Sequence, residues 1–247
     1  MKIIVPILLG LLLAPLSLLR AAVAADLVLL SDGKSDYQIV VPDHAETEVL
    51  DECLNQAARL VQTALQANGA EVPVVREKKR DPAKPTLFLG NTEFARRQGV
   101  DVTELREWSY VHRVVGQDVI IAGHDHPARG ETTNGRRPNW DRVSTAKAAV
   151  DFVRQYAGVR FLYPDIAPYN PVAAAANVDL LASPAIEFLP METIAVPQEL
   201  NTSKTPVLRL NTAHPAGGGF YDLAHNCFPR VDEVFGGHTW QRAVPPE

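Results

Sequence analysis

The chain has 247 residues, of which 46% are hydrophobic and 21% charged, a composition typical of soluble globular proteins. Its formal net charge is −5 and it holds no long basic run, so nucleic acid is not expected as a partner. The length accommodates one domain with a sizeable core, or one domain and part of a second.

Residues 1–24 have the pattern of an export signal. Lys2 precedes an almost wholly apolar run from Ile3 to Leu19, and Ala22-Val23-Ala24 gives an A-x-A cleavage pattern. The run contains two prolines and is shorter than the roughly 20 residues that a spanning helix needs. We therefore expect a secreted or periplasmic protein, cleaved near Ala24/Ala25, with no stable membrane insertion after cleavage. A retained membrane anchor is the alternative.

The first half of the remaining chain predicts two strands and a long helix. Apolar runs over 27–30 and 37–41 flank a turn at Ser31-Asp32-Gly33-Lys34, and Pro42 ends the second run. Asp43 followed by Glu46 resembles a capping box at the start of the helix. The helix shows one continuous apolar face, made by Val49, Leu50, Cys53, Leu54, Ala57, Leu60, Val61, Ala64 and Leu65.

The next segment predicts strands over 72–75 and 86–89, a short helix over 92–98, and a β-hairpin. The hairpin joins Tyr110–Val115 to Val119–Ala122 through Gly116-Gln117-Asp118, residue types that suit a tight turn.

A second long helix follows the hairpin, with Ala146, Ala149, Val150, Val153 and Tyr156 at helical spacing. Gly158 stands where a helix end favours positive φ, and the apolar run 159–163 predicts a further strand. Strand, helix and strand together predict a right-handed β-α-β unit.

These elements predict an α/β two-layer sandwich, with a mixed sheet and both long helices on one face. Prolines punctuate the chain after Asp165, so we expect one α/β domain over 26–189. Residues 190–247 are then a linker and the incomplete start of a following domain.

Several segments in this order resemble one known domain type. They are Thr86-Leu-Phe-Leu-Gly-Asn91, Ile120-Ile-Ala-Gly123, Arg129-Gly130, 148–153 and Gly158-Val-Arg-Phe-Leu-Tyr-Pro164. The region is similar to the non-catalytic N-terminal α/β domain that precedes the barrel in β-N-acetylhexosaminidases and α-glucuronidases (glycoside hydrolase families 20 and 67). The same domain opens secreted, uncharacterised glycosidase-like proteins. Residues 131–143 depart from it as an insertion.

The resemblance implies a hexosaminidase domain-2-like fold and a role in carbohydrate processing. The catalytic carboxylates of these families lie in the barrel, and this chain ends before a barrel could form, so no catalytic residue is carried over. We expect an exported accessory domain without a cofactor, whose partner is carbohydrate or the missing C-terminal barrel domain. Whether this chain is itself an enzyme stays open.

Loop aromatics offer a second hypothesis, a stand-alone glycan-binding module. Trp140, Tyr169, Tyr221 and Trp240 fall in expected loops, where rings can stack on sugars. His238 and Trp240 belong to Gly236-Gly-His-Thr-Trp240, which resembles the start of the next domain in the uncharacterised proteins, so we place them nearest a ligand.

A third hypothesis is a small metal-dependent hydrolase that uses the loop Gly123-His124-Asp125-His126. His and Asp are suitable ligands, but the sequence places no third ligand. Two adjacent carboxylate pairs, Asp51-Glu52 and Asp232-Glu233, lack the contrast in environment that general acid–base chemistry needs. For Cys53 and Cys227, a disulfide and a buried Cys53 thiol both remain open.

Overall fold

The computed structural model describes residues 25–106, 108–125, 143–162, 179–206 and 219–226. At its centre lies a six-stranded sheet in the order β10-β5-β6-β4-β2-β3. The strands are β2 (Gln38–Val41), β3 (Val74–Arg76), β4 (Thr86–Leu89), β5 (Tyr110–Val115), β6 (Asp118–Gly123) and β10 (Asn201–Lys204). β3, β2, β4 and β6 run parallel, whereas β5 and β10 pair antiparallel, so the sheet is mixed as expected.

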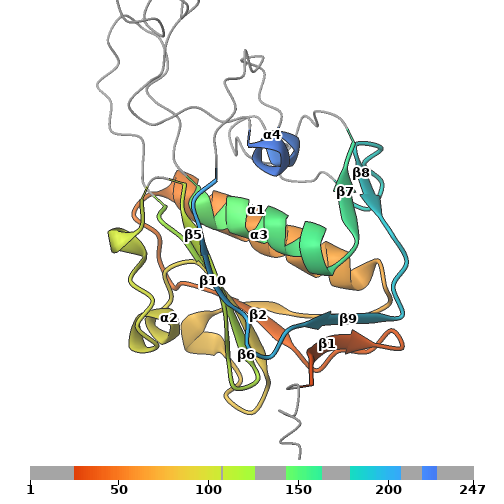
Figure 1. Ribbon diagram of the computed structural model, residues 1–247, viewed down its shortest axis with the longest axis horizontal. Coiled ribbons are helices and arrows are strands. Elements are labelled where there is room, and N and C mark those ends of the chain that lie inside the picture. The colour runs from red at the N-terminus through yellow and green to blue at the C-terminus, as the bar shows by residue number, and fades with distance from the viewer. Residues whose placement is uncertain (1–24, 107, 126–142, 163–178, 207–218, 227–247) are drawn as a thin grey trace, which may run out of the picture.

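Both long helices, α1 (Glu48–Gln66) and α3 (Ser144–Tyr156), lie side by side on one face of this sheet (Figure 1). The apolar face expected for α1 is buried, apart from Val49, whose side chain is not described. It packs against alternate residues of the parallel strands, among them Ile39, Leu87 and Ile121. The prediction that both long helices lie on one face of a mixed sheet is confirmed.

The opposite face of the sheet is covered by shorter elements, α2 (Glu93–Arg97) and the 3₁₀ helix η2 (Val102–Glu104). A smaller apolar cluster joins them to the sheet through Ala95, Val100, Val102, Val111, Ile120 and Ala122. Phe88 stacks on Phe94 with ring centroids 4.1 Å apart. Because both faces are covered, β4 is buried along its whole length, and its sequence is an uninterrupted run rather than an alternating one.

The expected capping box of α1 is wrong. The helix begins at Glu48, and the Thr47 hydroxyl accepts a hydrogen bond from the Leu50 amide at 3.2 Å. Asp43 instead accepts from the backbone amide of Lys78 at 3.1 Å, in the 3₁₀ helix η1 (Glu77–Lys79) beside it. Glu77 of that segment in turn accepts from the first amides of α2.

The expected β-α-β unit is also wrong, although its hairpin and helix form where predicted. β7 (Val159–Phe161) pairs with β8 (Ile186–Phe188) in a separate two-stranded sheet and does not join the central one. The hairpin itself explains this, because β5 occupies the edge of β6 that a returning strand would need.

The described fold continues past residue 189, the boundary expected from the sequence. β9 (Thr193–Val196) pairs with β1 (Leu27–Ser31), and β10 forms the edge of the central sheet beside β5. α4 (Gly219–His225) packs against α3 and β7. None of the described helices is long and apolar enough to cross a membrane.

Candidate functional site

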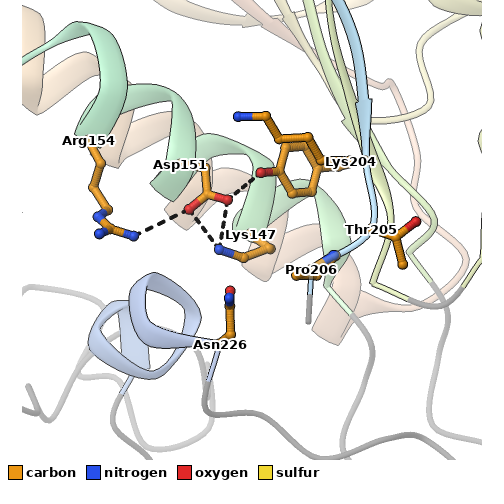
Figure 2. Close-up of a pocket in the computed structure, with 8 residues that line it drawn as sticks. Lys147, Asp151, Arg154, Lys204, Thr205, Pro206 and Asn226 are labelled. Carbon is orange, nitrogen blue, oxygen red and sulfur yellow. Dashed lines mark hydrogen bonds and ion pairs between the residues drawn. The ribbon is translucent and has the colours of Figure 1, made fainter. Parts of the chain in front are cut away.

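A polar pocket of about 350 Å³ opens beside α3, between the end of β10 and the end of α4 (Figure 2). Its walls carry hydroxyl, amide and charged groups. The lining residues are Tyr110, Lys147, Asp151, Arg154, Lys204, Thr205, Pro206 and Asn226.

Helical spacing brings the charged groups together. Lys147, Asp151 and Arg154 are four and three residues apart on α3, so they share one face of the helix. Tyr110 begins β5 and Lys204 ends β10, and these two residues are partners in the antiparallel register. The central sheet and the helix layer meet at this point.

A buried ion pair forms the floor of the pocket. The Lys147 ammonium donates to both carboxylate oxygens of Asp151 at 2.7 Å, and the two side chains are 2% and 18% exposed. The Tyr110 hydroxyl donates to the same carboxylate. An Arg154 guanidinium nitrogen lies 3.6 Å from Asp151 Oδ1 (Figure 2).

The protonation states follow from this burial. The pKa of Lys147 is lowered, because the effect of burial exceeds the opposing effect of the Asp151 carboxylate. Burial and the nearby Asp151 charge raise the pKa of Tyr110 well above its usual range, so the phenol stays a neutral donor. With two donors fixed on it, Asp151 is poorly placed to act as a general base.

A second hollow of about 620 Å³ adjoins the first. The two share Asp151, Arg154 and Lys204, and the second adds Arg160 and His225 to its lining. We call the two hollows together the α3 groove. Among the described residues, its lining holds four Lys and Arg side chains and one carboxylate, that of Asp151.

His112 lies in the core next to this floor. It is fully buried, and its Nε2–H donates to the Ala148 carbonyl at 2.9 Å. Burial lowers its pKa to about 4, so the ring is neutral at physiological pH. Its Nδ1 has no hydrogen-bond partner among the described residues. These contacts make His112 a core residue that joins β5 to α3.

The described part of the metal loop is engaged in structural contacts. The Asp125 carboxylate accepts from the Thr145 amide at 2.8 Å and from the Thr145 hydroxyl at 2.6 Å, at the first turn of α3. His124 Nδ1 lies 2.7 Å from the Leu105 carbonyl oxygen. Within the described residues, no group of three or more His, Cys, Asp or Glu could hold a metal ion. His126 lies outside them.

The residues expected near a glycan are largely outside the described structure. Trp140, His238 and Trp240 are not described, and for Tyr221 only the backbone position in α4 is given. Cys53 is buried on α1, and Cys227 lies outside the described residues.

The α3 groove was not predicted from the sequence. A signal was nevertheless present: Lys147, Asp151 and Arg154 have helical pair spacing, and Lys147 stands next to the apolar positions of α3. Of the two adjacent carboxylate pairs, Asp51-Glu52 serves local structure, since Asp51 accepts from the Arg76 guanidinium at 2.7 Å, and Asp232-Glu233 lies outside the described residues.

No protein-family model matches this chain, and no curated protein matches its sequence.

Proposed function

We propose that this chain is an exported accessory domain of a carbohydrate-processing, glycoside-hydrolase-like protein, and that it does not itself hydrolyse glycosides. The observation that carries the proposal is the architecture: a mixed sheet with both long helices on one face. The resemblance implies this arrangement for a domain that stands ahead of a catalytic barrel.

The chemistry of the α3 groove also supports a non-catalytic role. Glycoside hydrolysis needs two carboxyl groups about 5 to 9.5 Å apart, one of them able to give a proton. Within the described part of the chain the groove is lined by one carboxylate, Asp151, and that group is bound by Lys147 and Tyr110. An ion pair of this kind stabilises local geometry, and the described lining residues of the groove offer no acid–base pair for a sugar.

The test combines the intact mass of the protein exported by its native host with glycosidase assays on this purified chain. We expect a mass well above the 27.0 kDa of this chain. We also expect no release of nitrophenol from aryl β-N-acetylglucosaminides or aryl α-glucuronides.

Either of two results would overturn the proposal. Turnover by the purified chain that disappears in Asp151→Asn would make the α3 groove an active site. A native mass close to that of this chain without its signal, together with saturable binding of neutral oligosaccharides, would identify a stand-alone glycan-binding module.

A further inference from the structure

Among the described residues, the lining of the α3 groove holds more positive charge than its one carboxylate, Asp151, neutralises. Lys147 is paired with Asp151, and Arg160 has its own partner in Glu187 at 3.3 Å. Arg154 shares the already paired Asp151 at 3.6 Å. The Lys204 ammonium donates to a neutral group, the Gln155 amide oxygen, at 3.1 Å. Two cations, Arg154 and Lys204, therefore lack a carboxylate of their own among the described residues.

These two cations stand where a ligand could reach them. Arg154 and Lys204 line both hollows of the groove, and the Arg154 side chain is 42% exposed. One Arg154 nitrogen donates to the Ala224 carbonyl of α4, which fixes the guanidinium at the groove wall. The remaining guanidinium N–H groups can serve a planar or tetrahedral oxyanion, as arginine commonly does.

Neutral hydrogen-bonding groups flank the same space. The Thr205 hydroxyl and the Asn226 amide line the first hollow, and the Asn226 Oδ1 is buried without a hydrogen-bond partner among the described residues. An amide in this position can turn to present either a donor or an acceptor. Figure 2 shows Asn226 directed towards the Lys147 ammonium from the α4 side.

The positive groups act on one another. The charges of Arg154 and Lys204 both depress the pKa of Lys147, in addition to the larger effect of burial. Like charges held this close raise the free energy of the empty groove, and a bound anion would relieve that repulsion. The groove is thus better matched to an anion than to a neutral or cationic ligand.

We propose that the α3 groove is an oxyanion-binding site, in which Arg154 and Lys204 hold a carboxylate, sulfate or phosphate group above the Lys147–Asp151 pair. The ligand is either a free inorganic anion or the acidic group of a charged saccharide. This assignment rests on the groove alone and stands whether or not the chain accompanies a catalytic barrel.

Isothermal titration calorimetry at constant ionic strength tests the proposal. Sodium sulfate, sodium phosphate and galacturonate are titrated against sodium chloride and galactose as matched controls. We expect saturable binding of at least one oxyanion and none of galactose. Binding of sulfate or phosphate alone identifies a free anion as the ligand, and binding of galacturonate alone identifies an acidic sugar.

Variants locate the binding. Lys204→Gln and Arg154→Gln should each weaken oxyanion binding about tenfold, because each removes one charge-assisted hydrogen bond. Lys204→Arg keeps the positive charge and should therefore retain oxyanion binding. Lys78→Gln is the control, because Lys78 is 77% exposed and does not line the groove. A shared melting temperature shows that the variants are folded.

Two results would overturn the assignment. One is the lack of saturable heat with all three oxyanions. The other is equal affinity in wild type, Lys204→Gln and Arg154→Gln, which would mean that the anion binds elsewhere on the surface.

Discussion

Replacing Lys147 by Met tests whether the ion pair under the α3 groove holds the helix layer to the sheet. Methionine keeps the length and apolar stem of the side chain but removes the ammonium. The Asp151 carboxylate, 18% exposed, would then lose both 2.7 Å hydrogen bonds from Lys147. It would keep the Tyr110 hydroxyl and the more distant Arg154.

Breaking a buried ion pair by removing one partner costs about 3–5 kcal/mol, because the other charge is left uncompensated. Asp151 keeps two partial partners and some contact with water, so we expect the lower end, about 3 kcal/mol of unfolding free energy. Removing the stranded charge as well, in Lys147→Met/Asp151→Asn, should recover part of that loss. The coupling energy of the pair should be about 2 kcal/mol.

Urea denaturation, followed by the far-ultraviolet circular dichroism of α1 and α3, measures both quantities. The matched control is Arg97→Met, which breaks a pair of the same four-residue spacing on α2. Its partners, Arg97 and Glu93, are 62% and 63% exposed, so the loss should stay below about 0.5 kcal/mol. A cost below about 1 kcal/mol for Lys147→Met, or additive effects in the double variant, would refute this account of the groove floor.

Three further predictions concern the core and its helix ends. His112 has a pKa of about 4 in the folded protein and about 6.5 in the unfolded chain, because burial disfavours its charge. The unfolded state therefore takes up the proton first, and stability should fall by about 3 kcal/mol from pH 7.5 to pH 4, a slope that His112→Gln should flatten in urea titrations. Gly123→Ala should lower the melting temperature sharply, because a Cβ there would lie 2.4 Å from the backbone carbon of Ser144; an unchanged melting temperature would contradict the close approach of β6 to α3. Thr47→Ala should cost about 1 kcal/mol of unfolding free energy by removing the cap of α1, and Asp43→Ala should cost less, because Asp43 does not cap the helix.

Local patterns in the sequence are sufficient for several elements of this fold. The apolar residues of α1 recur at helical spacing, and only a continuous apolar layer can cover such a face, so its burial follows directly. The hairpin of β5 and β6 follows from two apolar runs around a turn, and Gly116 adopts the positive φ of 63° that the turn needs. In both cases the interacting residues are close in the chain.

Local sequence patterns predicted the wrong capping residue for α1. Asp43 and Thr47 are both good capping residues, and the sequence offers no direct measure of which one begins the helix. Tertiary contacts decide between them. The Lys78 backbone amide donates to the Asp43 carboxylate, and the helix is capped about one turn later by Thr47.

Tertiary structure alone decided the strand partners and the groove. From its sequence alone, β7 would be expected to join the central sheet. However, β5 already fills the edge beside β6, and β10, from much later in the chain, fills the outer edge of β5. The groove follows from that pairing, since β10 brings Lys204 beside Tyr110 and hence over the charged face of α3. Residue spacing within α3 determines that Lys147, Asp151 and Arg154 share a face. The third cation, Lys204, reaches this face only because β10 pairs with β5. These two strands are almost a hundred residues apart in the chain, so no local periodicity encodes their contact.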